Sequence, residues 1–378
     1  MKKNCCIIIR SICFMLIFVG LLYYFCYVLT VRNVERYPVR NGFWQTYDAE
    51  EDNSIDALFV GDSSIFHSIN PMQIWKDKKI TTYNLSYAVM KPQEAYFDLK
   101  RAFKTQSPKT VFVESQFMVE TESDSFDYFT DDTKEIAGFI NDQIGGTLDN
   151  FFPIMKYKRS WKNLTFRDFV SNHPNKIRSI YKGYNLTMKT VSYNGTHGKK
   201  SKDRACFADE GEIYFKKIYN LCKKNNCNVV LLNMPQGNAW NKIKHNFVAK
   251  LAKEYNIKYY DFDMNLNKWL PNFSWKTDTR DAGHHLNYSG AKKVTGLMEK
   301  YMVEDLGFKP SKVSESVRKQ WNRDVNDFYQ VADFLKAREM TKDSPEFPQP
   351  LKPDFYHQNF NLRKWQYVLS LFFRIIKL

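Results

Sequence analysis

The chain has few cysteines, and their placement excludes a fold held together by disulfides. Of the seven cysteines in 378 residues, four lie within the first 26, which leaves Cys206, Cys222 and Cys227 for the rest. Three cysteines do not make a disulfide framework. Cys222 and Cys227 could pair, but we prefer to interpret them as buried thiols, one on a helix and one starting a strand. Ligands at the spacing of a zinc site are also missing, so we expect no metal.

Nucleic-acid motifs are missing as well, although the formal net charge is +15. Lys and Arg are scattered along the chain and do not gather in one stripe, so we expect no nucleic-acid partner. A diffuse positive charge attracts polyanions and anionic lipid surfaces without dedicated pockets, and solubility alone explains it equally well. With 43% hydrophobic and 16% aromatic residues, the chain is not disordered and can bury one large α/β core with additions.

Residues 11–31 form an uncharged and almost wholly apolar stretch, long enough to cross a bilayer as a helix. Lys2, Lys3 and Arg10 precede it, and no small-x-small cleavage site follows before Arg32. We therefore predict that residues 1–32 are an uncleaved, single-pass signal anchor in the cell membrane. Basic residues on both flanks blur the charge asymmetry, but a cytoplasmic N-terminus and an extracytoplasmic body are favoured. Residues 33–54 are predicted to be a linker.

A short apolar run, Ala57 to Val60, stops at Gly61, Asp62 and Ser63. Four consecutive apolar residues are typical of a strand buried on both faces in a parallel sheet. Working groups gather outside the carboxyl ends of such strands, and Ser63 has that position. Ordinary turn and capping chemistry is the competing interpretation, because Gly, Asp and Ser all favour turns.

A second polar stretch far downstream contains Asp281, His284, His285 and Asn287. A serine becomes nucleophilic when a base removes its proton, and the imidazole base needs a carboxylate that fixes its tautomer. The two stretches together therefore favour a Ser-His-Asp triad over a simple turn.

Strands and helices alternate between residues 55 and 305, which predicts a doubly wound α/β domain with a parallel sheet. Residues 118–208 interrupt the alternation and are predicted to be an inserted, mainly helical cap that shapes a substrate groove; a surface excursion is the alternative. The predicted strands are 57–60, 81–86, 110–114, 228–233 and 258–262, and the predicted helices are 92–103, 209–224, 241–255 and 289–303.

Gly61, Asp62 and Ser63 near the first strand, with Asp281 and His285 near the last helix, resemble the SGNH (GDSL-type) hydrolase superfamily of esterases and acyltransferases. The resemblance covers residues 55–305 and rests on two short motifs. It implies a three-layer, flavodoxin-like parallel sheet. It also implies a serine esterase or O-acyltransferase that needs no cofactor.

The resemblance also implies an oxyanion hole formed in part by the backbone N–H of Ser63. Where the family has a glycine in its second motif this chain has Ser86, which can still donate its backbone N–H. Where the family has an asparagine after the third strand, this chain has Glu114, Ser115 and Gln116, and Gln116 is the substitute donor. The polar neighbours predicted to contact substrate are Asp62, Asn84, Glu114 and His284.

The triad motif allows two registers. The family usually places the acid three residues before the base, which would pair Asp281 with His284. The base is commonly followed by an apolar residue, as His285 is by Leu286, and we predict His285 as the base. Leu286 would then anchor the loop in the core, and Asn287 would cap the next helix.

An N-terminal anchor followed by an extracytoplasmic domain of this kind resembles DltD-type proteins of Gram-positive envelopes and proteins that O-acetylate exported polysaccharides. The implied partner is an anionic envelope polymer, such as teichoic acid, or an acylated glycan. The alternative is a catalytically inactive scaffold that binds envelope glycan or a membrane partner.

Residues 306–378 are predicted to be a C-terminal helical extension. A helix over 311–340 would pack on the domain, and a Pro-rich linker would follow it. The end, Trp365–Leu378, is too short to span a membrane. It is predicted to lie in the membrane interface, to bind a partner such as a membrane-bound acyltransferase, or to pack within the chain.

Overall fold

The computed structural model describes most of the predicted α/β domain and the N-terminal helix. Most of the predicted cap and the whole segment Trp365–Leu378 lie outside the described residues, so those predictions are not tested. The described residues are 2–36, 43–121, 169, 178–195, 204–208, 210–237, 239–264 and 266–337.

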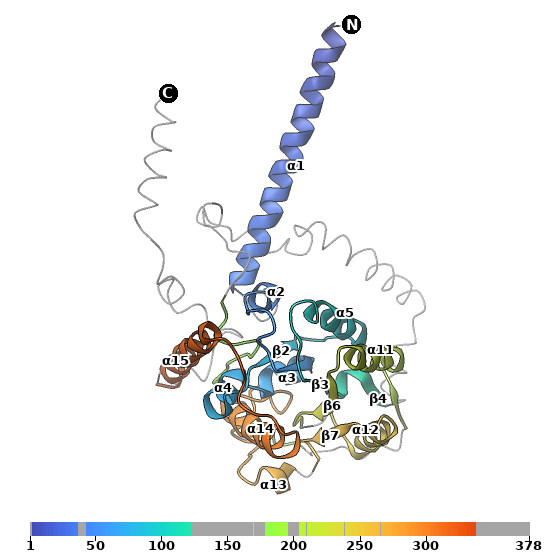
Figure 1. The fold of residues 1–378 in the computed structure, drawn as a ribbon, viewed down its shortest axis with the longest axis vertical. Coiled ribbons are helices and arrows are strands. Elements are labelled where there is room, and N and C mark those ends of the chain that lie inside the picture. Colours follow the sequence, from blue (N-terminus) through green and yellow to red (C-terminus); the bar gives the residue numbers. More distant parts are fainter. Residues whose placement is uncertain are drawn as a thin grey trace.

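The centre of the fold is a five-stranded parallel sheet with strand order β2-β1-β3-β6-β7 (Figure 1). The predicted α/β class and parallel sheet are confirmed. Because the strand order changes direction between β1 and β3, a topological switch point lies at the carboxyl end of β1. The strands are β1 (Ala57–Gly61), β2 (Thr82–Ser86), β3 (Thr110–Glu114), β6 (Asn228–Asn233) and β7 (Lys258–Asp261).

Helices cover both faces of the sheet, which explains why the strands are apolar at consecutive positions. Leu58 and Val60 point to one face, into a core shared with α5 (Pro92–Ala102), α11 (Gly211–Lys224) and α12 (Lys242–Glu254). Ala57 and Phe59 point to the other face, toward α3 (Ser63–Ser68), α4 (Pro71–Lys78) and α14 (Tyr288–Lys300). The result is the three-layer arrangement expected from the sequence.

Several short elements were not predicted from the sequence. Strands β4 (Val119–Thr121) and β5 (Ala205–Phe207) form a small antiparallel sheet. A 3₁₀ turn (Gln116–Met118) follows β3, α13 (Leu266–Trp269) follows β7, and a π-helical turn (Tyr301–Asp305) ends α14. Elements this short carry too few residues for a periodic pattern to reveal them.

The C-terminal part of the described chain is α15 (Glu315–Ala337), where a helix was predicted. Its apolar residues Val317, Trp321 and Phe328 form a third core cluster with α4 and with Tyr181 and Tyr184. The rings of Trp321 and Trp75 lie 5.4 Å apart between centroids. The predicted packing of this helix on the domain is therefore confirmed.

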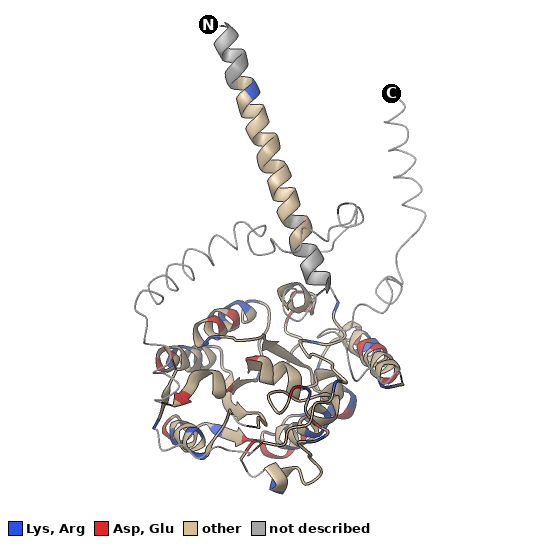
Figure 2. Cartoon of the chain, turned by 180° about the vertical axis from the view of Figure 1, so that it is seen from behind, with Lys and Arg blue, Asp and Glu red and all other residues tan. Residues whose placement is uncertain are grey.

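The N-terminal helix α1 (Lys2–Arg36) projects from the domain (Figure 1). Its segment Ile9–Cys26 is long and apolar enough to cross a membrane, and 6% of that segment is buried in the protein. Within it Arg10 is the one charged residue (Figure 2). Length and composition therefore agree with a membrane span, and a signal sequence would have the same features.

The second half of the predicted linker is part of the folded domain, which corrects that prediction. Phe43–Tyr47 form α2, and the side chains of Phe43 and Tyr47 belong to the core beside Tyr83. Glu50 is also buried. Most residues of 43–54 are polar, so the sequence does not show that Phe43 and Tyr47 each pack on Tyr83 in the folded chain.

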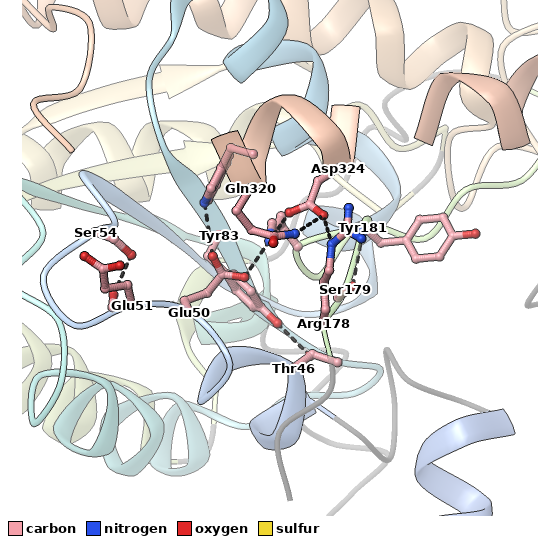
Figure 3. A network of polar contacts seen from close by, with 12 residues as sticks. Thr46, Glu50, Glu51, Ser54, Tyr83, Arg178, Ser179, Tyr181, Gln320 and Asp324 are labelled. Carbon is pink, nitrogen blue, oxygen red and sulfur yellow. Dashed lines mark hydrogen bonds and ion pairs between the residues drawn. The ribbon is translucent and has the colours of Figure 1, made fainter. Parts of the chain in front are cut away.

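Glu50 belongs to a buried ionic network that joins three separate segments (Figure 3). The ammonium of Lys182 lies 2.6 Å from Glu50 Oε1 and 2.8 Å from Asp324 Oδ2 of α15. Trp321 Nε1 donates to Glu50 Oε2 at 3.1 Å, and Arg178 pairs with Asp324. Burial opposes the charge on Lys182, but the two carboxylates outweigh it and raise its pKa. The network ties the residues after α1 to the C-terminal helix.

The predicted anchor leads to a direct expectation about solubility. The full-length protein should resist extraction from membranes by high salt or alkali, because an apolar helix of this length has no favourable place in water. A fragment that begins at Asn41 removes α1 but keeps Phe43 and Glu50, so it should fold and stay in solution. Fractionation followed by centrifugation measures both. Recovery of a mature protein that begins after Thr30 would contradict an uncleaved anchor.

Candidate active site

Ser63 stands at the carboxyl end of β1, beside the switch point of the sheet. β1 ends at Gly61, and α3 begins at Ser63 because Asp62 caps it: the Asp62 side chain accepts the Ser64 N–H at 2.8 Å. Short polar side chains at the N-cap satisfy N–H groups that the first turn leaves unpaired. The cap thus fixes where the strand stops and where Ser63 sits.

His285 links Ser63 to Asp281. Its Nε2 lies 2.8 Å from Ser63 Oγ, and its Nδ1 lies 2.5 Å from Asp281 Oδ2. The other carboxylate oxygen of Asp281 accepts the backbone N–H of His285 at 2.7 Å. The acid and the base are therefore four residues apart, and His284 is exposed beside them. The structure brings together the three residues that the sequence analysis chose for the triad.

The carboxylate of Asp281 is held in its ionised form. Burial opposes ionisation, but the hydrogen bonds from His285 and the positive charge of Arg280 outweigh it, so the Asp281 pKa lies below its ordinary value. An ionised Asp281 accepts from His285 Nδ1–H, which leaves Nε2 as the acceptor facing the Ser63 hydroxyl. This is the tautomer that a general base needs.

Leu286 and Asn287, which follow His285, lie where the sequence analysis predicted: one in the core and one at the N-cap of the next helix. Leu286 is 1% exposed and lies in the core between the sheet and α14. Asn287 caps α14, with its side-chain oxygen accepting the Gly290 N–H at 3.1 Å. Both contacts fix the orientation of His285 just before the helix.

A second histidine, His67, packs beside His285 and was missed by the sequence analysis. The two imidazole rings are 4.8 Å apart between centroids, and Arg280 donates to His67 Nε2 at 2.8 Å. Burial chiefly, and then the charges of His285 and Arg280, hold the His67 pKa well below its ordinary value. The imidazole of His67 is therefore neutral, and it packs against the ring of His285. The one sequence signal is that His67 lies one helical turn after Ser63 on α3.

The loop that carries Asp281 and His285 is held by Tyr193. A side chain at Gly283 would meet the Tyr193 ring at 2.7 Å, and one at Gly237 would meet it at 2.6 Å. Gly283 also has φ +90°, a conformation that favours glycine. Gly237 N–H donates to the Gly283 carbonyl at 2.7 Å. The loops that contain Gly237 and Gly283 are therefore in direct contact, and the ring of Tyr193 packs on both.

The predicted oxyanion donors lie at the carboxyl ends of the strands that flank β1. Ser86 is the last residue of β2 and pairs in register with Gly61. Gln116 follows β3, where its amide Nε2 donates to Gln236 Oε1 at 2.6 Å. Their contributions to an oxyanion hole stay predictions, as do substrate contacts for Asp62 and His284.

Two residues predicted to contact substrate are instead interior groups. Asn84 is fully buried and donates from Nδ2 to the Ile69 carbonyl at 2.7 Å. Glu114 is also fully buried and accepts the Asp62 N–H at 2.8 Å. Asn84 thus fixes the end of α3 and Glu114 fixes the turn after β1. Side chains at a strand end alternate between the two faces, and the sequence did not show which would fold inward.

Metal ligands do not cluster in the part of the chain that the structure describes. Within those residues no group of three or more His, Cys, Asp or Glu side chains is placed to hold a metal ion. Cys222 and Cys227 are buried free thiols, as the sequence analysis expected.

Comparison with known proteins gives structural likeness only. No protein-family model matches the chain, and no curated protein matches its sequence. A GDSL-like lipase from Bacteroides thetaiotaomicron is similar in structure, with 9% identity, a TM-score of 0.36, and coverage of 70% of this chain and 97% of that one. The acetylxylan esterase of Geobacillus stearothermophilus has 12% identity, a TM-score of 0.34, and coverage of 70% and 99%.

A psychrotrophic esterase from a Pseudoalteromonas species gives 10% identity, a TM-score of 0.34, and coverage of 67% of this chain and 100% of that one. TM-scores this low carry no inference about function. The chemistry of the site therefore has to be judged from its own geometry.

Proposed function

We propose that the chain is an SGNH-type serine esterase or O-acyltransferase that works through Ser63, His285 and Asp281. One observation carries the proposal: the hydroxyl, imidazole and carboxylate form a continuous hydrogen-bonded series at the carboxyl end of β1. That order of groups makes a serine nucleophilic wherever it occurs, whatever the sequence positions. The position at the switch point of a parallel sheet is where α/β folds bind ligands.

The reaction follows from the geometry. His285 Nε2 takes the Ser63 proton as Oγ attacks the carbonyl carbon of an ester, and Asp281 stabilises the imidazolium that forms. The C–O bond to the leaving alcohol breaks, and the imidazolium returns its proton to that alcohol, which leaves an acyl group on Ser63. His285 then deprotonates the acceptor as its oxygen attacks the acyl carbon. The bond from that carbon to Ser63 Oγ breaks, and the imidazolium returns its proton to Ser63. Water as acceptor gives an esterase, and a sugar hydroxyl gives a transferase.

We further propose that the substrate is an acylated polysaccharide or teichoic acid of the cell envelope, handled outside the membrane in which α1 is anchored. The support is the candidate span at the N-terminus and the net charge of +15. Basic and acidic side chains are interspersed over the described helices (Figure 2). Such a diffuse field raises the local concentration of a polyanion without a single binding patch. An N-terminal anchor followed by an extracytoplasmic domain of this kind resembles the arrangement of DltD-type proteins.

An inactive scaffold that binds glycan or a membrane partner is the second candidate. It is favoured by Ser86 and Gln116, which stand where the resembled family has a glycine and an asparagine.

Labelling by a fluorophosphonate probe separates the two candidates. We expect the probe to react with the full-length protein, and peptide mass spectrometry to find the adduct on Ser63, because a phosphonate traps only a serine that a base activates. Excess of a soluble acetyl ester should slow the labelling. If Ser63 stays unlabelled while the protein is folded, the scaffold is the correct function. Comparing envelope polymers of a strain lacking the gene with those of its parent by mass spectrometry would identify the ester.

A further inference from the structure

The turn that carries Ser63 rests on one buried carboxyl group, that of Glu114. Glu114 Oε2 accepts the backbone N–H of Asp62 at 2.8 Å, and its Oε1 accepts the hydroxyl of Ser64. The residue just before the nucleophile and the residue just after it are thus bound to the same group. The hydroxyl of Ser63 does not take part in these contacts and is hydrogen-bonded to His285.

The place of Glu114 in the sheet explains Gly61. Val60 of β1 pairs with Val113 of β3, so Glu114 is the next residue beyond that pair on its strand, as Gly61 is on its own. A Cβ on Gly61 would lie 2.4 Å from Glu114 Oε2 and 2.6 Å from Glu114 Cβ. The missing side chain therefore gives the room in which the Glu114 carboxyl folds over the end of β1.

We propose that Glu114 is a positioning residue of the site: by holding Asp62 and Ser64 it fixes the direction of Ser63 Oγ toward His285. The inference rests on the function proposed above and deepens it. It also gives a role to the last residue of the third strand, at the point where this chain departs from the resembled family. Glu114 acts through Ser63 and does not touch the substrate, since its side chain is fully buried.

The chemistry of the carboxyl group decides which replacements keep both contacts. Burial first, and the nearby Asp62 second, raise the Glu114 pKa well above its ordinary value. A neutral carboxylic acid and a primary amide have nearly the same shape. Glutamine can accept the Asp62 N–H through its amide oxygen. Its NH₂ can donate to Ser64 Oγ, which keeps that contact with the direction of the hydrogen bond reversed. Aspartate is one methylene shorter and cannot reach both.

The test uses full-length protein in detergent micelles and measures the rate of fluorophosphonate labelling. It also measures kcat and KM for p-nitrophenyl acetate per labelled site. For Glu114→Ala and Glu114→Asp we expect labelling and kcat to fall on the order of 100-fold with little change in KM. A misdirected nucleophile loses rate without losing binding. Glu114→Gln should restore the rate to within about fivefold of wild type.

The matched control is Glu299→Gln. Glu299 is a buried carboxyl of α14 with a pKa raised by burial to about 7, and it lies outside the turn of Ser63. Its replacement should leave the labelling rate at the wild-type value. A residue that served only to stabilise the fold would lower the folded fraction while leaving kcat per labelled site unchanged.

Each outcome has a definite meaning. The inference is overturned if the Glu114→Asp protein is folded and is labelled at the wild-type rate. It is also overturned if Glu114→Gln does not restore the labelling rate. If Glu114→Ala does not fold, Ser64→Ala decides, because it removes one of the two contacts and should slow labelling about tenfold. If the wild-type protein itself is not labelled, the proposed function fails and this inference falls with it.

Discussion

Replacing His285 with alanine is expected to lower ester turnover about a thousandfold or more while leaving the fold intact. His285 Nε2 is the group at 2.8 Å from Ser63 Oγ, and without it the hydroxyl keeps its proton. The ring is 24% exposed and belongs to none of the hydrophobic core clusters, so circular dichroism should match wild type and thermal unfolding should change little. Ser63→Ala should abolish fluorophosphonate labelling, because the atom that bonds to phosphorus is gone.

His284→Ala is the matched control, since it removes an adjacent histidine that is exposed to solvent. Its kcat for p-nitrophenyl acetate should stay within a few-fold of wild type, because the substrate contact predicted for His284 would affect binding of a large substrate and not the proton transfer at Ser63. The opposite result, with His284→Ala inactive and His285→Ala active, would show that the acid and base are three residues apart and that the triad assigned here is wrong.

Lys182→Met is expected to lower the free energy of unfolding by about 3–5 kcal/mol, the usual loss when one partner of a buried ion pair is removed. Lys182 is 1% exposed, and both carboxylates that it faces are buried with it. Methionine fills a similar volume but leaves Glu50 and Asp324 without their common cation. Urea unfolding of the fragment that begins at Asn41, monitored by tryptophan fluorescence, measures the change in the free energy of unfolding.

Lys319→Met on α15 is the matched control for that experiment. Lys319 and Glu315 form a pair at 3.6 Å in which both side chains are mostly exposed. Pairs of this kind contribute about 0.5 kcal/mol or less. A loss at Lys182 no larger than the loss at Lys319 would mean that the buried network contributes nothing to stability.

The strands and most helices could be predicted because their signals are local. Ala57 to Val60 are apolar in a row because helices cover both sides of the sheet, and that run is legible in the sequence alone. α15 likewise shows its buried face as apolar residues at helical spacing. α2 could not be found in this way, because Phe43 and Tyr47 pack against Tyr83, which is far away along the chain.

That Ser63, His285 and Asp281 lie together could be predicted because serine, histidine and aspartate carry chemistry that few other side chains provide. Their supports could not. Glu114 folds over Gly61 only because β1 and β3 are neighbours in a particular register, and a single sequence does not show strand register. His67 supports His285 from an element more than two hundred residues earlier, and its burial is visible only in the folded chain.

The sequence separation of the triad has a consequence for synthesis. Ser63 and His285 are 222 residues apart, and the sheet between them must assemble before they meet. At the usual rate of translation, the serine leaves the ribosome roughly 10 to 45 s before its histidine does. During that interval the nascent chain carries an unactivated hydroxyl. Under the proposed function, Ser63 therefore gains its base only after residue 285 has left the ribosome and the sheet has formed, and a chain that ends before Asp281 has neither the acid nor the base.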